Sequence, residues 1–328
     1  MTLNLMATCP NWVYFSFGFG LWIYASFDAI DGKQARRTGT SGPLGELFDH
    51  SCDALNTTFV GLLAISAIKI EKDWWAISHI FISYANFYLT TWETYYTGTL
   101  YLSYFSGPVE GLTGVCLCLM LTGYVGNATW AQSIRSLLGL SIGTLPFIPD
   151  VPVNKLIILF TWLVLSLNSV VSIYNAVFSS GKKTGPSSLL GLAPFLLASG
   201  LGYLWLLASP HIFVTCLVPF IIFLGFTVAY NVGLIILAHL TKTPFPFFNH
   251  LYLFLIFGAL NSNMPLLFNR PALLQGPYEI AYVYYCMAHS VAFYFYYSSS
   301  VINEICEYFD IYCLSIKHLD RVPGYKTD

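Results

Sequence analysis

Long apolar stretches separated by short polar breaks run along the whole sequence. Stretches of roughly 17–25 apolar residues are long enough to cross a bilayer as helices. The predicted spans are 12–37, 45–69, 75–98, 108–125, 153–179, 187–207, 210–240, 248–268 and 276–300. The pattern predicts an all-α, polytopic membrane protein with about nine transmembrane helices, in which residues 1–328 form a single integral-membrane domain.

The composition supports this class. Of 328 residues, 56% are hydrophobic and only 9% are charged, whereas a soluble domain carries about 25% charged residues. The formal net charge is −2 and no basic tract is present, so nothing predicts nucleic-acid binding. Segment 131–146 is apolar but short, and we expect it at the membrane interface. Residues 301–328 form a predicted cytosolic tail, with helical spacing over 302–310.

The Lys and Arg residues indicate an orientation. If the loop after the first span is cytosolic, nine of the 14 basic residues lie on that side and five lie opposite. This is a modest positive-inside bias. The glycosylation sequon at Asn127-Ala-Thr129 then falls on the lumenal side, where it can be used. We therefore predict that the first loop faces the cytosol.

A polar motif lies around that loop. It reads D-x2-D-G-x2-A-R-x8-G-x3-D-x3-D and comprises Asp28, Asp31, Gly32, Ala35, Arg36, Gly45, Asp49 and Asp53. Carboxylates in or near hydrocarbon are costly, and they usually mark functional sites. The spacings i, i+3 and i, i+4 place each aspartate pair on one helix face. Glycine, proline and small polar residues between the pairs predict a turn, so an antiparallel helix pair would bring the two faces together.

Four adjacent carboxylates need a counter-charge because they repel one another. One or two divalent cations would supply it, and oxygen ligands favour Mg²⁺ or Mn²⁺. A buried ion-pair network is the alternative, but the four acids outnumber the nearby base. Gly32, Ala35 and Gly45 would let a bulky group approach the helices, and the Arg36 guanidinium suits a phosphate. The motif thus predicts a site for a metal-bridged diphosphate.

Other side chains are candidates for catalysis or binding. His50 titrates in a useful range, and Glu46 lies one turn away on the same predicted helix. These two could supply a general base, or they could simply be solvated polar residues. Glu110 could position a substrate or favour a helix N-terminus. Trp92, Tyr95 and Tyr96 could box a quaternary ammonium, although an interfacial aromatic belt is the plainer interpretation. The remaining histidines show no metal-ligand spacing.

The complete motif resembles the signature of the CDP-alcohol phosphotransferases. Two sequence segments resemble the eukaryotic choline/ethanolamine phosphotransferase branch. They are Asp28-Ala-Ile-Asp-Gly-Lys-Gln-Ala-Arg-Arg37 and Pro43-Leu-Gly-Glu-Leu-Phe-Asp-His50. Two further segments are similar to fungal members of that branch. They are Trp92-Glu-Thr-Tyr-Tyr-Thr-Gly-Thr-Leu100 and Ser106-Gly-Pro-Val-Glu-Gly111.

This resemblance implies transfer of phosphocholine or phosphoethanolamine from CDP-choline or CDP-ethanolamine to diacylglycerol, with release of CMP. It also implies an endoplasmic reticulum or Golgi membrane, a cytosol-facing site and a homodimer. The metal ligands would be Asp28, Asp31 and Asp49, with Asp53 a further ligand or the general base. The nucleotide-diphosphate pocket would be lined by Gly32, Ala35, Arg36 and Gly45.

The beginning of the chain departs from the family pattern. Relatives carry a further transmembrane helix before the first span predicted here, which would make ten. Only eleven residues precede that span in this sequence. We interpret this as a truncation in preference to a site that lacks one wall. The alternatives are an acceptor such as inositol, which the words around the motif disfavour, or a non-catalytic lipid-binding protein of the same fold. Prenyl synthases use a different aspartate spacing.

Overall fold

The computed structural model describes residues 9–98, 108–137, 139, 150–179 and 184–317. These residues contain no β-strand and are mostly helical, which confirms the predicted all-α class. The helices are α1 (Asn11–Thr38), α2 (Pro43–Ala67), α3 (Trp74–Thr97), α4 (Pro108–Val125), η1 (Asn127–Ala131), α5 (Ile134–Leu137), α6 (Val153–Phe178), η2 (Pro186–Leu192), α7 (Ala193–Ala208), α8 (His211–Thr215), α9 (Leu217–Thr241), α10 (Tyr252–Phe268) and α11 (Pro277–Phe309).

The long helices follow the predicted spans closely. Four are long and apolar enough to cross a membrane: α1, α6, the unit Pro186–Ala208 and α9. Two shorter apolar helices are Glu110–Val125 and Tyr252–Phe268. A polytopic membrane protein is therefore confirmed. Parts of three predicted segments lie outside the described residues. They belong to the interfacial segment 131–146, the segment Ser106–Gly111 and the cytosolic tail, of which residues 318–328 are not described.

Prolines divide two of the predicted spans. The span predicted at 210–240 consists of α8 and α9, with a break at Cys216. A proline at position 219 clashes with the carbonyl of residue 215 and offers it no N–H, so one helix cannot run through both. The span predicted at 187–207 begins as the 3₁₀ helix η2 and becomes α7 near Pro194. At the other end, α11 does not stop at the predicted residue 300 but continues to Phe309.

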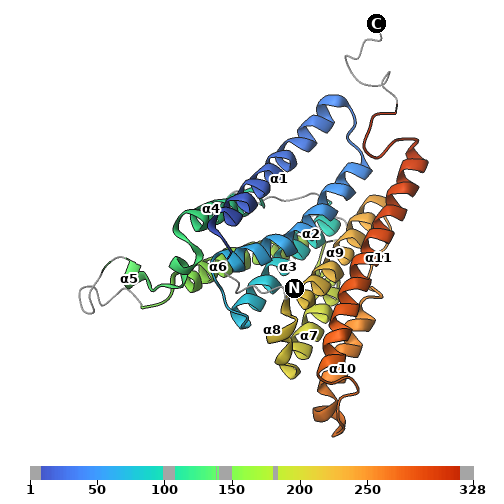
Figure 1. Cartoon of the computed structure of the whole chain (residues 1–328). Helices are drawn as coiled ribbons and strands as arrows, with labels where there is room; N and C mark the ends of the chain where they lie inside the picture. The colour runs from blue at the N-terminus through green and yellow to red at the C-terminus, as the bar shows by residue number, and fades with distance from the viewer. Residues whose placement is uncertain (1–8, 99–107, 138, 140–149, 180–183, 318–328) are drawn as a thin grey trace.

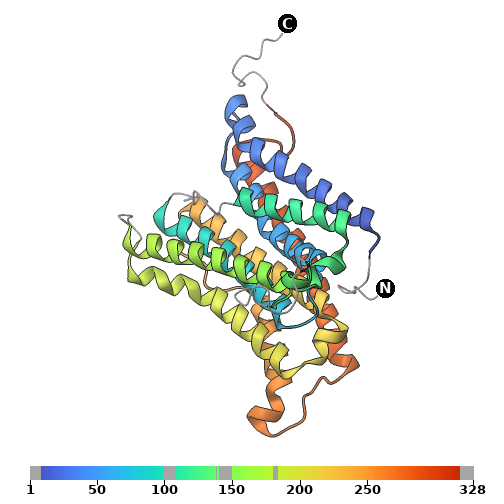
Figure 2. The same ribbon diagram turned by 90° about the vertical axis from the view of Figure 1, so that its left-hand side faces the viewer.

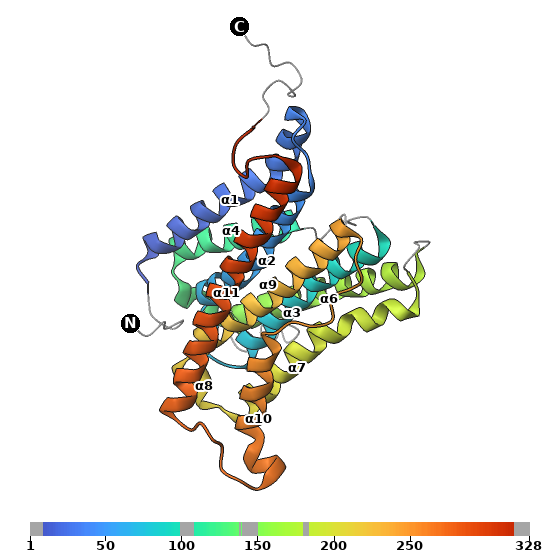
Figure 3. The same cartoon turned by 90° about the vertical axis from the view of Figure 1, so that its right-hand side faces the viewer.

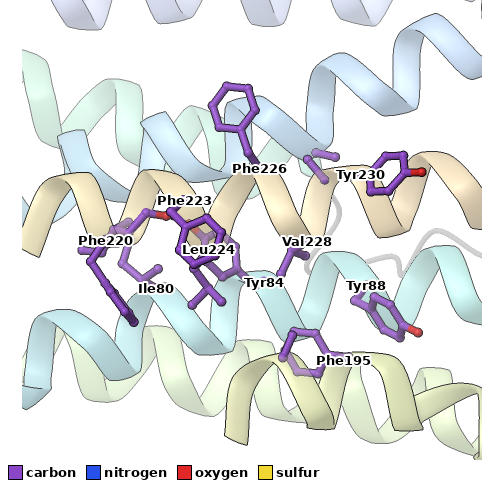
Figure 4. Packing of buried hydrophobic residues seen from close by; sticks show 14 of the residues in the cluster. Ile80, Tyr84, Tyr88, Phe195, Phe220, Phe223, Leu224, Phe226, Val228 and Tyr230 are labelled. Carbon is purple, nitrogen blue, oxygen red and sulfur yellow. The ribbon is translucent and has the colours of Figure 1, made fainter. Parts of the chain in front are cut away.

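The helix α9 forms the centre of the molecule. It packs against α2, α3, α7 and α11, and 83% of its most apolar stretch is buried. Phe220, Phe223 and Leu224 point from α9 toward Ile80 and Tyr84 of α3 (Figure 4). Within a bilayer such contacts stabilise the bundle by close van der Waals packing, because lipid is as apolar as these side chains. This core fixes α2 and α3 beside α9, and α2 carries half of the aspartate motif.

The helices α1 and α4 form a separate pair at the edge of the bundle (Figures 1 and 2). The main neighbour of α1 is α4, and α1 touches α2 much less. The predicted meeting of the two aspartate faces therefore does not involve packing of α1 on α2 along their whole length. Gly123 of α4 explains part of this preference, because a Cβ there would lie 2.7 Å from the Phe15 ring of α1. The two helices approach closely only because position 123 has no side chain.

Candidate active site

The turn between α1 and α2 places the two aspartate pairs next to each other. Gly39 ends α1 in a left-handed conformation with φ of 69°, and its N–H reaches the carbonyls of Ala35 and Arg36. Pro43 opens α2, at the first helical position where its missing N–H has no cost. The predicted turn is confirmed, and Arg36 and Arg37 lie in the last turn of α1.

Three carboxylates meet between α1 and α2. Asp28, Asp49 and Asp53 are partly buried, and one ligand oxygen from each lies within 4.8 Å of the others. The side chains of Asp28 and Asp49 are in hydrogen-bonding contact. Two carboxylates at this distance require a shared proton or a cation between them. Three hard oxygen ligands around one point fit a divalent metal such as Mg²⁺ or Mn²⁺.

Asp31 lies outside this group of three. It is exposed, and one of its carboxylate oxygens accepts a hydrogen bond from the backbone N–H of Gly32. An i, i+3 pair is offset by about 60° around a helix, which leaves Asp31 nearer the solvent than Asp28. Its charge is still close enough to repel Asp28, Asp49 and Asp53. Its role as a ligand stays a prediction.

Tyr24 belongs to the site, although the sequence analysis did not include it. Its hydroxyl donates a hydrogen bond to Oδ1 of Asp53 across the gap from α1 to α2. Tyr24 lies one turn before Asp28, on the same helix face. That spacing was the available signal, but a tyrosine in a sequence with 23 of them does not stand out.

The predicted substrate-binding residues line the same region. A Cβ at Gly45 would meet nothing within 4 Å, so the surface of α2 is open there. At Gly32 a Cβ would lie 3.5 Å from Nη1 of Arg36, which shows that the guanidinium folds back over this glycine. Ala35 is partly buried beside them. These residues leave room for a ligand with a guanidinium at its edge.

His50 and Glu46 face a different neighbour from the aspartates. They line a narrow cavity between α2, α3 and α9, together with Thr91, Thr94, Ile235, Ile236 and His239. His50 is partly buried, and Glu46 is exposed at the mouth. A general base in this cavity would lie beside the three carboxylates and would be a separate side chain from them. The presence of His239 here was not predicted, because its spacing from the motif gives no signal.

The other candidates lie elsewhere. Glu110 is exposed in the first turn of α4, and the residues before it, 99–107, lie outside the described part. Trp92 is fully buried, with its Nε1 donating to the carbonyl of Ser188 at 3.0 Å. Tyr95 donates its hydroxyl to the Thr243 carbonyl at 2.8 Å, and Tyr96 stacks on Phe245. These aromatic residues pack α3 against its neighbours, which fits a structural role.

Comparison with known proteins agrees with this geometry. The CDP-alcohol phosphatidyltransferase family matches residues 2–145, a segment that contains α1, α2 and the whole motif. Choline/ethanolaminephosphotransferase 1 of Saccharomyces cerevisiae is 35% identical over 329 residues, which cover 96% of this chain and 81% of the yeast protein. The chain belongs to the CDP-alcohol phosphatidyltransferase family. The predicted membership and enzyme class are thus confirmed.

Other relatives of this phosphotransferase family have similar coverage. Cholinephosphotransferase 1 of Saccharomyces cerevisiae is 34% identical over 94% of this chain and 79% of its own length. An uncharacterized class-I family protein of Schizosaccharomyces pombe is 37% identical over 95% of this chain and 79% of its own length. The similarity therefore extends through α9, α10 and α11, well beyond the aspartate motif.

Proposed function

We propose that this enzyme transfers phosphocholine, phosphoethanolamine or both from the CDP-alcohol to diacylglycerol. The products are phosphatidylcholine or phosphatidylethanolamine, and CMP. The convergence of Asp28, Asp49 and Asp53 within 4.8 Å carries the proposal. Three carboxylates so placed can bind a divalent cation, and such a cation neutralises the charge of a diphosphate. The names of the yeast relatives indicate the two head groups.

The aspartates hold a divalent metal in this proposal, with Mg²⁺ or Mn²⁺ as the ion and two ions as the expected number. When bound, the metal neutralises charge on the diphosphate oxygens. Asp28, Asp49 and Asp53 are the ligands that the geometry favours, and Asp31 is a fourth. Arg36 offers a charged fork to the same phosphates. Gly32, Ala35 and Gly45 keep the helix surfaces clear for the nucleotide.

A base must take the proton of the diacylglycerol hydroxyl. The hydroxyl oxygen forms a new bond to the β-phosphorus, the bond from that phosphorus to the bridging oxygen breaks, and CMP leaves with the electron pair. His50 is the base in this proposal, and Glu46 orients it. Both side chains line the cavity beside the carboxylates. The alternative base is Asp53, but a carboxylate that binds a metal is a poor proton acceptor.

The cellular setting follows from the same proposal. We place the enzyme in the endoplasmic reticulum or Golgi membrane, with its active site toward the cytosol and with a homodimer as its assembly. The Lys and Arg distribution supports this orientation. Glu110 remains a predicted contact for the substrate at the start of α4. Residues 1–328 are one domain in this proposal, with a cytosolic tail from residue 301.

The test is CMP release by the purified protein in detergent with diacylglycerol. CDP-choline and CDP-ethanolamine are compared, each with and without Mg²⁺, beside an Asp49→Asn variant. We expect metal-dependent turnover that the variant lacks, and the better donor identifies the head group. Absence of turnover with both donors would favour the second candidate, a non-catalytic lipid-binding protein of the same fold.

A further inference from the structure

The Tyr24 hydroxyl bridges the two helices that form the carboxylate cluster. It comes from α1, where Asp28 lies one turn further on, and donates to Asp53 of α2. We propose that Tyr24 is a positioning residue that holds the Asp53 carboxylate in place as a metal ligand. This inference rests on the proposed function, because it assumes that the cluster binds a divalent metal.

The packing around Tyr24 makes its hydroxyl a fixed donor. Tyr24 packs against a small core built from α1, α4 and α2 that includes Leu21, Cys116 and Ala67. Its ring is therefore held by neighbours that do not belong to the carboxylate cluster. A donor anchored in this way defines the orientation of the carboxylate that accepts from it.

A positioned donor matters here because α1 and α2 contact each other little. The carboxylates of Asp28 and Asp53 come from different helices, and α1 is held mainly by α4. Without a tie between them, the distance from Asp28 to the α2 ligands would vary with the motion of the α1–α4 pair. The hydrogen bond from Tyr24 of α1 to Asp53 of α2 connects the two helices within the site.

The hydrogen bond also leaves part of the Asp53 carboxylate available to a cation. One lone pair on its Oδ1 accepts from Tyr24, which leaves its remaining lone pairs for a metal. Tyr24 can therefore orient this carboxylate without blocking it as a ligand.

The test is a Tyr24→Phe variant, which removes only the hydroxyl. Tyr14→Phe is the matched control, because Tyr14 lies on the same helix and its hydroxyl accepts from Nδ2 of Asn127 at 3.0 Å. The separation of ten positions places Tyr14 about 15 Å from Tyr24 along the helix. Mn²⁺ binding to the full chain in detergent is measured by the loss of the free-ion electron paramagnetic resonance signal. Thermal unfolding without metal is measured for each variant.

We expect Tyr24→Phe to weaken Mn²⁺ binding by roughly 10-fold to 100-fold, as removal of such supporting partners commonly does. Tyr14→Phe should bind within twofold of the unaltered protein. In turnover, Tyr24→Phe should raise the Mg²⁺ concentration for half-maximal rate by a similar factor, with kcat at saturating metal reduced less than threefold. A residue that only supported the fold would lower the unfolding temperature and leave Mn²⁺ affinity unchanged.

Each outcome separates the two proposals. Equal Mn²⁺ affinity in Tyr24→Phe and the unaltered protein would overturn the positioning role but leave the metal centre intact. Loss of kcat at saturating metal, with unchanged affinity, would also overturn it, because a residue that only positions a metal ligand acts through metal affinity. Absence of Mn²⁺ binding by the unaltered protein would overturn the proposed function, and the role of Tyr24 with it.

Discussion

Two kinds of side chain separate on the surface of α2. Asp49 and Asp53 point toward α1 and meet Asp28, whereas His50 and Glu46 point toward α3 and α9. Successive residues differ by about 100° around a helix, so the neighbours Asp49 and His50 necessarily face different surroundings. One helix can thus present metal ligands on one side and a candidate base on the other.

This separation predicts that proton transfer and metal binding can be altered independently. A His50→Gln variant should lose turnover by roughly 100-fold or more, the usual contribution of a positioned general base. Its Mn²⁺ affinity should stay within twofold of the unaltered protein. Glu46→Gln should lose less, because Glu46 acts through His50. Normal turnover of His50→Gln at every pH would rule out His50 as the base.

The sequence predicted much of this site but not all of it. The motif spacing placed Asp28, Asp49 and Asp53 correctly, because helical periodicity and one short turn determine their positions. It could not show that Asp31 lies outside this group, since an i, i+3 pair covers a broad face. It could not identify Tyr24 or His239, because their partners come from other helices and depend on tertiary packing.

At the scale of helices, the positions were predictable and the packing was not. Apolar length determines where a helix runs, so the ranges of α1, α2, α3 and α4 agree with the predicted spans within a few residues. Neighbours depend on the shape of each surface. The α1–α4 pairing depends in part on a glycine at position 123, one of 25 glycines in the chain. Nothing in an apolar pattern distinguishes that glycine from the others.

The shapes of two helix surfaces lead to opposite predictions for two glycines. At Gly225 of α9, a Cβ would lie 2.6 Å from the Tyr84 hydroxyl and closer still to Thr58. Overpacking of this kind typically costs about 1–3 kcal/mol, so Gly225→Ala should lower the unfolding temperature. Gly45→Ala has open space and should leave the unfolding temperature unchanged.

For binding of the CDP-alcohol donor, we expect the reverse: Gly45→Ala should have an effect and Gly225→Ala should not. We expect Gly45→Ala to raise the KM for the CDP-alcohol several-fold, because its methyl group projects into the predicted nucleotide pocket. Gly225→Ala should leave that KM nearly unchanged at a temperature where it is folded. An unchanged KM in Gly45→Ala would remove Gly45 from the predicted pocket.

Across the whole molecule, α11 connects the active-site end with the opposite end (Figure 3). The Tyr294 hydroxyl donates to the Ser51 carbonyl of α2 at 3.1 Å, beside the aspartate motif. Near the other end of α11, the buried carboxylate of Glu279 accepts from Nε1 of Trp205 and Oγ of Ser209, each at 2.7 Å. These contacts join α11 to α2 near the middle of α11, and to α7 and the residue that follows α7 near the start of α11.

The Glu279 cluster should therefore support the fold without taking part in the reaction. Its carboxylate also lies 3.1 Å from Nε2 of His211, which begins α8. Glu279→Ala would leave the indole N–H and the serine hydroxyl without their acceptor in a buried site, at a cost of about 1–3 kcal/mol for each donor. We expect a clearly lower unfolding temperature, with turnover and Mn²⁺ affinity retained at a temperature where the variant is folded. Glu307→Gln, an exposed change on the same helix, is the control and should unfold like the unaltered protein. A Glu279→Ala protein that unfolds normally but loses turnover would instead place this distant cluster in the catalytic cycle.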